Sequence, residues 1–431
     1  MSKRPAIQSH EWFAVSVAFA YFFCVLAAYY VIRPVRDQLS AAVGSTALPI
    51  FYAATFVVTL ALMPLFGALV ARFQRRTFVP VVYLFFLLGM LAFIPLFQMQ
   101  DLIGARLLGS IFFVWVSVFN LFVVAVFWSF MADLLDSEQA HRLFPVIALG
   151  GTLGAIAGPA LTRSLNEVVG VSGLLVMSST LLGLAIACIL ALSRWSRRHP
   201  VVGDEQRDTR VIGGSFIAGA IETVKSPLMR RLAILMLLGD AVGTVINALL
   251  ADYSGATFSA REERINFAAN IDLYANLLQV VLQLGLTRAL LVRFGPAPAL
   301  ALDGIIKAIM LAGLALFAGP WIAAVAVVTR ASAYGVFKPA ADSLYTRVDA
   351  ETRYKTKNFI DTSVWRFGDL AVTSSINLLR SIGTTVPGLA LLSMLAAGSS
   401  AWIGWRAARM LPEDGPAMRK PAGKEALDNA A

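Results

Sequence analysis

Twelve apolar stretches alternate with short polar stretches along the chain. They lie near residues 12–32, 47–70, 77–97, 107–131, 143–162, 171–193, 229–250, 266–287, 297–318, 320–345, 358–382 and 386–408. Most reach the roughly 20 residues that a helix needs to cross the apolar core of a bilayer. Several lack a clear helical periodicity, as expected of helices surrounded by lipid, and none alternates as β-barrel strands do. The pattern predicts an all-α polytopic membrane protein with about 12 transmembrane helices.

The longest polar stretch, residues 194–227, divides these segments into six and six. We therefore predict an N-terminal six-helix bundle over 1–193, a cytoplasmic linker over 194–227 and a C-terminal six-helix bundle over 228–410. The remaining residues, 411–431, combine proline, glycine and charge, and we expect them to form a disordered cytoplasmic tail.

Short internal matches indicate that the two halves are repeats. The run Asp136–Arg142 matches Asp349–Lys355 at an offset of 213 residues, and Val31–Arg33 matches Val245–Asn247 at an offset of 214. Each match falls at the same place in its half. Parallel halves of six helices, each with nested inverted repeats, are the major facilitator arrangement, which is the fold that we predict.

The distribution of charge predicts the orientation of the chain. The net charge is +10 although only 14% of residues are charged and 58% are hydrophobic. With a cytoplasmic N-terminus, 25 basic residues fall in inside segments and seven in outside segments, which is the positive-inside pattern. We predict cytoplasmic termini, a bacterial inner membrane and no nucleic-acid partner.

No motif predicts an enzyme or a cofactor site. Cys24 and Cys188 lie in apolar stretches and are expected to be core residues, and the sequence contains no metal-ligand spacing, phosphate loop or dinucleotide fingerprint. Transport by exchange or by an ion gradient is therefore expected, without a cofactor and without bound ATP as the energy source. We expect a monomer.

Ionisable residues inside the apolar stretches are the candidate functional groups, because a charge in the bilayer core costs several kcal/mol on most scales. They are Arg33, Arg36, Asp37, Asp240, Asp272, Lys307, Arg330, Lys338, Asp342, Asp361, Arg366 and Asp369. Any one of them could form an ion pair that fixes two helices, or extend to the membrane surface. Together they favour a polar cavity between the halves.

Two clusters are the most informative. Arg33 and Arg36 share one helical face, Asp37 follows, and Pro34 is expected to break the helix there. Two guanidinium groups suit a phosphate or carboxylate, although interfacial anchoring would explain them too. The second cluster extends from Thr352 to Asp369 and joins a basic loop to a helix with buried charges, although loop charge alone would account for its lysines. A third pattern, the glycine-rich run Gly150–Gly158, is expected to let helices pack closely.

Five segments in order resemble the ATP/ADP translocases, the nucleotide transporter family of plastids and intracellular bacteria, and their free-living bacterial relatives. They are Arg33–Asp37, Phe127–Asp133, Ser137–Pro145, Phe337–Asp349 and Lys355–Asp361. The last resembles the family motif Lys-Gly-Lys-x-x-Ile-Asp. The resemblance implies that Arg36, at the position of a functional lysine, and Lys355 and Lys357 contact phosphate groups.

This sequence departs from the family at three acidic positions. Val116 lies near the place of a family glutamate, Asn247 replaces another, and Lys338 replaces the aspartate of Phe-Asp-Pro. Because these carboxylates are thought to select among nucleotides, exchange of adenine nucleotides cannot simply be transferred to this chain. An anionic, phosphorylated substrate is the conservative expectation.

We therefore predict a secondary transporter that carries a nucleotide or a related organic anion by alternating access. Carriage of a lysophospholipid, drug or sugar phosphate, or a non-transporting scaffold role, remain alternatives. The predicted substrate-binding residues are Arg33, Arg36, Asn247, Lys338, Lys355, Lys357 and Arg366. The predicted gating or ion-pair residues are Asp37, Asp133, Glu138, Asp342, Asp361 and Asp369.

Overall fold

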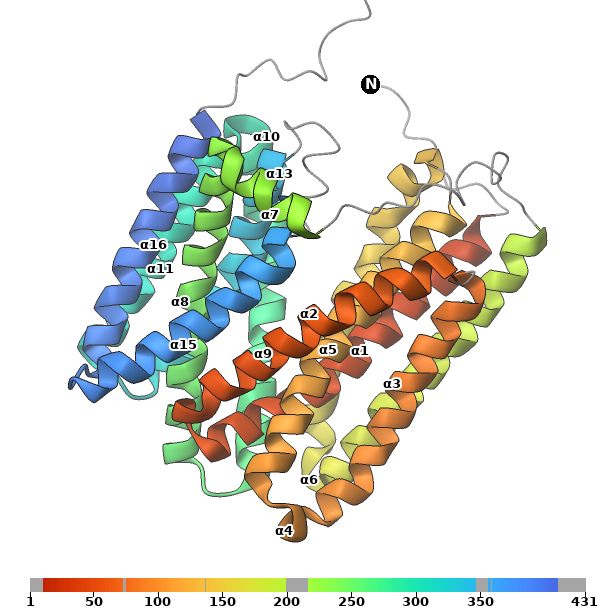
Figure 1. Cartoon of the computed structure of the whole chain (residues 1–431), viewed down its shortest axis with the longest axis horizontal. Helices are drawn as coiled ribbons and strands as arrows, with labels where there is room; N and C mark the ends of the chain where they lie inside the picture. The colour runs from red at the N-terminus through yellow and green to blue at the C-terminus, as the bar shows by residue number, and fades with distance from the viewer. Residues whose placement is uncertain are drawn as a thin grey trace, which may run out of the picture.

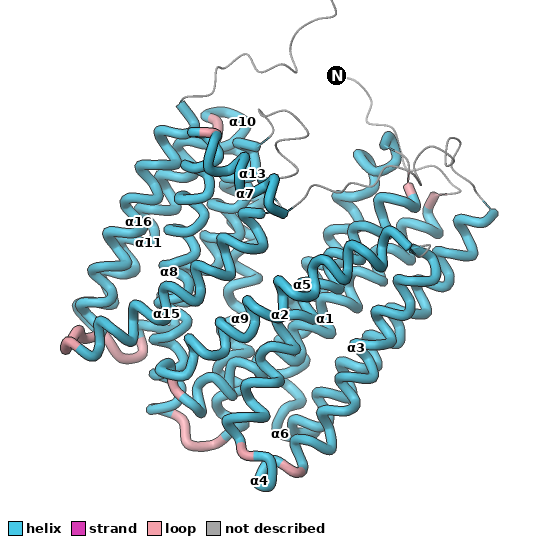
Figure 2. The backbone as a smooth tube through the Cα atoms, in the orientation of Figure 1, coloured by secondary structure: helices cyan, strands magenta, loops and turns pink. Residues whose placement is uncertain are grey.

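The computed structural model describes residues 11–72, 75–135, 137–198, 216–345, 356–357 and 359–409, and no strand occurs among them. Nine of their helices are long and apolar enough to cross a membrane. The predicted all-α polytopic fold is confirmed. Figure 2 shows the described chain as helices joined by short loops.

The N-terminal half contains six membrane-crossing segments. Its elements are α1 (Trp12–Val43), the 3₁₀ turn η1 (Ser45–Ala47), α2 (Leu48–Arg72), α3 (Arg75–Gln98), α4 (Gln100–Ile103), α5 (Ala105–Leu134) and α6 (Ser137–Arg198). The long α6 is two helices joined at Gly170, whose φ of 61° and ψ of −172° are not helical. Glycine allows this backbone conformation because it has no Cβ.

The C-terminal half also contains six crossing segments, several with a π-helical turn. Its elements are α7 (Phe216–Lys225), α8 (Pro227–Thr257), α9 (Arg261–Val281), η3 (Leu282–Thr287), α10 (Arg288–Phe294), α11 (Pro296–Phe317), α12 (Trp321–Ser332), η4 (Ala333–Phe337), α13 (Lys338–Tyr345), η5 (Ile360–Val364), α15 (Trp365–Ser381) and α16 (Val386–Arg409). The crossings α9–η3–α10, α12–η4–α13 and η5–α15 contain these π-turns. Such turns often mark functional sites.

The structure differs from the sequence prediction at Pro34 and adds a helix within the predicted linker. The expected break at Pro34 is wrong, because α1 continues as a helix to Val43. Neighbouring helices bury Pro34, and membrane helices tolerate proline where their surroundings satisfy the freed backbone groups. Helix α7 lies within the predicted linker. Residues 199–215 of that linker and the predicted tail 411–431 lie outside the described residues.

The two bundles stand side by side in Figure 1, α1–α6 in red to yellow-green and α7–α16 in green to blue. They diverge toward the end at which α1 begins and converge at the opposite end. Helix α1 contacts α8 and α9, α6 contacts α9, and α2 contacts α15. These pairs form the interface in which a site between the halves would lie.

The glycine-rich run brings α6 against α1 within the N-terminal bundle. A Cβ at Gly154 would overlap the carbonyl oxygen of Phe23, and one at Gly158 would lie 2.6 Å from the Cβ of Tyr30. The expectation of close packing is therefore confirmed for this pair of helices. The crossing fixes α1, which carries Arg33 and Arg36 toward the other bundle.

Candidate substrate site

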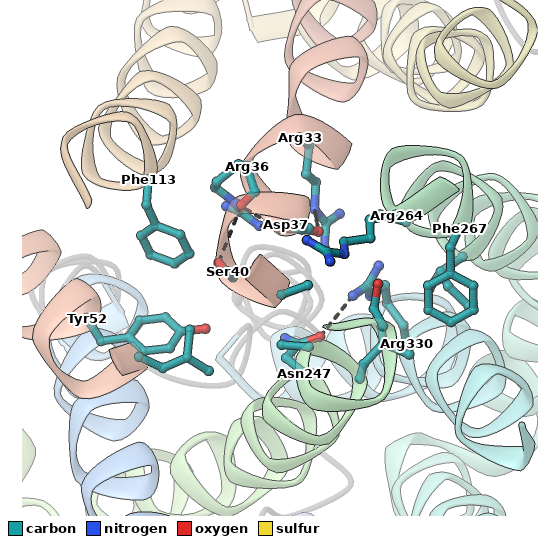
Figure 3. Close-up of a pocket in the computed structure, with 17 residues that line it drawn as sticks. Arg33, Arg36, Asp37, Ser40, Tyr52, Phe113, Asn247, Arg264, Phe267 and Arg330 are labelled. Atoms are coloured by element: carbon teal, nitrogen blue, oxygen red, sulfur yellow. Dashed lines mark hydrogen bonds and ion pairs between the residues drawn. The ribbon is translucent and has the colours of Figure 1, made fainter. Parts of the chain in front are cut away.

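A pocket lined by residues of both bundles lies between them. Its walls come from α1, α2 and α5 on one side and from α8, α9 and α12 on the other. The lining residues are Arg33, Arg36, Asp37, Ser40, Ala41, Leu48, Tyr52, Phe113, Asn247, Leu250, Ala251, Ser254, Arg264, Phe267, Ala268, Ile271 and Arg330. Figure 3 shows the polar members gathered around one space.

An ion pair across the bundles lies at this pocket. The buried carboxylate of Asp272 on α9 receives Arg33 Nη1 from α1 at 3.3 Å and a short hydrogen bond from Arg330 Nη1 of α12. Arg330 uses its second nitrogen, Nη2, to donate to Asn247 Oδ1 on α8 at 2.9 Å. Side chains from four helices, α1 in one half and α8, α9 and α12 in the other, are thus joined in one hydrogen-bonded and ionic network.

Arg36 occupies a neighbouring position on α1. Its guanidinium donates to Asp37 Oδ1 from Nε at 2.9 Å and from Nη2 at 2.7 Å. Its Cζ atom also lies 5.1 Å from the centre of the Phe113 ring, which is a cation–π distance. Asp37 Oδ2 lies 3.8 Å from Arg33 Nε. Arg36 is therefore oriented by both a carboxylate and an aromatic ring.

Arg264 adds a further positive charge. Its Nε donates to the backbone carbonyl of Phe258 at 2.8 Å and its Nη2 to that of Ser259 at 3.3 Å. Carbonyl groups satisfy hydrogen bonds without neutralising the charge. Among the described residues, four arginines (Arg33, Arg36, Arg264 and Arg330) thus meet two carboxylates (Asp37 and Asp272) at the pocket. The formal excess is two positive charges.

Aromatic rings form a further part of the pocket wall. Tyr52 packs edge-on against Phe113 with ring centres 5.5 Å apart, and Phe267 lines the side formed by α9. In Figure 3 the arginines lie between these two aromatic regions. The arrangement can bind an anionic group at the arginines and an apolar or planar group beside the rings.

The sequence-predicted residues divide into groups. Arg33, Arg36, Asp37 and Asn247 line the pocket. Arg33 and Asn247 are also the positions aligned by the internal repeat, and they approach the pocket from α1 and α8.

Lys338, Lys357, Asp342 and Asp361 form a separate four-residue network that does not line this pocket. Lys338 Nζ lies 2.8 Å from Asp361 Oδ1, and Lys357 Nζ lies 2.5 Å from Asp342 Oδ1 and 3.1 Å from Asp361 Oδ2. Lys338 also lies 3.5 Å from Asp342. Two lysines and two aspartates balance formally, so the network contributes no excess charge.

The other predicted residues lie elsewhere. Arg366 Nη1 lies 3.7 Å from Asp369 Oδ2, and Asp369 Oδ1 accepts a hydrogen bond from Thr244 at 2.8 Å, joining α15 to α8. Asp133 is exposed near the end of α5. The side chain of Glu138 and the whole of Lys355 lie outside the described residues.

The charged and aromatic lining residues Tyr52, Phe113, Arg264, Phe267 and Arg330 were not among the predicted site residues, and neither was Asp272, which pairs with the lining residues Arg33 and Arg330. Asp272 and Arg330 carried a usable signal, since both are charges within apolar stretches. Arg264 resembled loop charge, and the aromatic residues cannot be distinguished from the many others in apolar helices. Only the meeting of helices from both halves identifies them.

A cluster that we call the interbundle clamp joins the halves at their converging end: Ser45 and Thr46 from η1, and Asp252, Asn377 and Arg380 from the C-terminal bundle. Ser45 donates to Asp252 from its backbone N at 2.9 Å and from Oγ at 2.8 Å. Arg380 Nη2 lies 2.7 Å from Asp252 Oδ2, and Asn377 donates to the Thr46 carbonyl at 2.9 Å. The pocket residues Leu250, Ala251 and Ser254 flank Asp252 on α8, so the clamp adjoins the pocket.

No protein-family model matches the chain, and neither does any curated protein. Solved structures are similar in fold. A bacterial homologue of the human lysosomal transporter Spinster, inward-facing and unoccupied, is 13% identical with a TM-score of 0.63, covering 94% of this chain and 98% of its own.

Two further transporters show the same similarity. The major facilitator transporter FucP, in its outward conformation, is 16% identical with a TM-score of 0.59, and the nucleoside transporter NupG is 13% identical with a TM-score of 0.62. Each comparison covers 94% of this chain and 100% of the other. The chain therefore has the major facilitator fold, with two six-helix bundles.

Proposed function

We propose that this protein is a secondary transporter that carries an organic anion across the membrane by alternating access. The substrate that the pocket suits best is a nucleotide such as ATP or ADP, or a related phosphorylated anion. The observation that carries the proposal is the excess of two positive charges at a pocket to which both bundles contribute arginines.

The chemistry of these side chains supports an anionic cargo. Guanidinium groups bind phosphate and carboxylate oxygens in pairs. Holding four of them near two carboxylates between the helices of a membrane protein is costly unless an anion compensates the surplus. The rings of Tyr52, Phe113 and Phe267 offer a surface for the organic part of the substrate.

The position of the pocket supports a carrier over a scaffold. A scaffold would need no surplus charge between its halves, whereas a carrier needs a central site that each bundle helps to form. The structural neighbours named above are transporters, including one for nucleosides. Cytoplasmic termini, a bacterial inner membrane and a monomeric state remain part of the proposal, as does exchange of one anion for another.

Sugar phosphates and lysophospholipids also carry phosphate and are the main competing cargoes. The test is uptake into proteoliposomes of labelled ATP, ADP, AMP, a hexose phosphate, a lysophospholipid and inorganic phosphate, with and without the same compound inside. We expect a nucleotide to be taken up fastest, and internal compound to accelerate its uptake. Fastest uptake of a hexose phosphate would retain the anion carrier and change its substrate.

The variant Arg36→Ala tests the role of the arginines. Hydrogen bonds to charged groups contribute roughly 1.5–3 kcal/mol each, so we expect uptake to fall by at least tenfold while the protein inserts normally. Arg293→Ala removes an exposed arginine of α10 outside the pocket and should leave uptake unchanged. Unchanged uptake of every anion by Arg36→Ala would refute the proposal.

A further inference from the structure

Asp272 occupies an unusual position for a carboxylate. Its residue is 1% exposed, and one oxygen, Oδ1, receives arginines from both bundles, Arg33 at 3.3 Å and Arg330 by a short hydrogen bond. A carboxylate that makes only structural contacts commonly uses both oxygens, because an unmet buried acceptor costs free energy. Asp272 uses one.

Unused hydrogen-bonding capacity lies on both sides of this pair. Asp272 Oδ2 and Arg33 Nε are buried without a hydrogen-bond partner among the described residues. A planar guanidinium has five donors. Arg33 directs its Nη1 to Asp272, whereas its Nε makes no hydrogen bond and has Asp37 Oδ2 only at the ion-pair distance of 3.8 Å. The two groups are therefore bound to each other less completely than their chemistry allows.

We propose that Asp272 is a resident counter-ion. In the empty carrier it holds the guanidinium groups of Arg33 and Arg330, and the anionic group of the substrate takes its place on them. This inference rests on the proposed function, and it adds a residue that sets how tightly an anion binds and how the empty pocket is neutralised.

Two arguments support a counter-ion that competes with the substrate. Carboxylate and phosphate oxygens accept the same hydrogen bonds from arginine, so one can substitute for the other. Without Asp272 the described pocket would hold four arginines against Asp37 alone, and an empty site with that surplus is expensive within a membrane. A built-in carboxylate lowers that cost while the pocket has no substrate.

Because Arg33 belongs to the N-terminal bundle and Arg330 to the C-terminal bundle, the exchange also changes a contact between the halves. Bound substrate would replace the Arg33–Asp272 pair with its own bridge between Arg33 and Arg330. Substrate binding would then be coupled to relative movement of the two bundles through Arg33 and Arg330.

The first test is equilibrium binding of ATP, with inorganic phosphate as the smaller probe, to purified full-length protein at fixed salt and pH. Asp272→Asn keeps the side-chain shape and removes the competing charge, so we expect the dissociation constant to fall by about tenfold. Asp272→Glu keeps the charge and should bind within about twofold of the natural protein. Glu263→Gln, the same charge change at an exposed position on the same helix α9, should have no effect.

A second variant changes the charge in the opposite direction and removes no native ion pair. Asn247 accepts a hydrogen bond from Arg330, so Asn247→Asp adds a second carboxylate beside this guanidinium. We expect binding to weaken by about tenfold. Asn247→Asp also tests the inference if Asp272→Asn fails to fold, which size-exclusion chromatography would reveal.

The outcomes separate this inference from the proposed function. Tighter binding by Asp272→Asn and weaker binding by Asn247→Asp support it, including the case in which only Asp272→Asn binds measurably. Equal or weaker binding by Asp272→Asn overturns it, as does the absence of binding of either probe to every variant. Binding without uptake would contradict the transport proposal while leaving the role of Asp272 standing.

Discussion

Arg33 and Arg36 lie three residues apart on α1, yet their charges are met in different ways. Arg36 is paired with Asp37 within its own helix, whereas Arg33 reaches Asp272 in the other bundle. The sequence predicts that both face one side of a helix, because spacing determines that. It cannot predict which acid each one meets, because Asp272 lies more than 200 residues away in the chain.

Phe113 should distinguish substrates with an organic ring from simple anions. The centre of its ring lies 5.1 Å from Arg36 Cζ, and the ring packs against Tyr52. Phe113→Leu keeps an apolar side chain but loses the ring. We expect the KM for ATP uptake to rise about three- to tenfold, consistent with aromatic contacts of roughly 0.5–1.5 kcal/mol.

Inorganic phosphate provides the matching measurement for Phe113→Leu, since it has no ring to stack. Its binding should change less than that of ATP, by about twofold from the cation–π contact alone. An equal loss for both probes would show that Phe113 acts by holding Arg36 rather than by contacting the organic part.

At the scale of single helices, hydrophobic patterning predicted the crossings better than their ends. The apolar stretch near 12–32 correctly located the start of α1, but the helix continues eleven residues further, to Val43. Those added residues carry Arg33, Arg36 and Asp37 into the pocket. Charged residues lower the hydropathy and therefore mark the end of a membrane helix in a hydrophobicity pattern. Here the charged residues contact other protein groups, so the helix continues past them.

The crossing of α1 and α6 depends on glycine, which gives a prediction for stability. Gly154→Ala adds a Cβ that would overlap the backbone oxygen of Phe23, and a backbone atom cannot move aside as a flexible side chain can. We expect a destabilisation of about 1–3 kcal/mol, measured as a lower melting temperature of the purified protein. Gly398→Ala is the control, because nothing lies within 4 Å of its Cβ position on α16. An equal drop for both variants would contradict close packing as the cause.

For the whole molecule, the chain divides into halves as the sequence predicts, because twelve apolar segments and a central polar stretch leave few other arrangements. Two crossings, α12–η4–α13 and η5–α15, are not among the nine that length and apolarity alone identify. They carry Arg330, Lys338, Arg366 and Asp369, which lower their hydropathy. Which charges meet in the pocket and which pair elsewhere depends on helix rotation and tilt, and packing between distant segments determines these.

The arrangement of the halves suggests how the proposed carrier would change state. The interbundle clamp joins η1 to α8 and α15 at the end where the bundles converge. Access to the pocket from that end requires these contacts to break. Each neutral hydrogen bond contributes roughly 0.5–1.5 kcal/mol, and those to charged groups contribute more. Substrate binding would have to offset the free energy of these contacts for the clamp to open.

Covalent closure of the clamp should therefore stop transport. Thr46→Cys combined with Asn377→Cys places thiols on two residues that the hydrogen bond from the Asn377 side chain to the Thr46 backbone carbonyl now joins. The background has Cys24 and Cys188 replaced by alanine. A short reducible thiol cross-linker should abolish uptake in proteoliposomes, and reduction should restore it, because the two bundles can no longer separate at this end. Each single-cysteine variant, treated alike, should keep its uptake. If the fully cross-linked protein continued to transport at the untreated rate, the bundles would not need to part here, and alternating access through this end would be wrong.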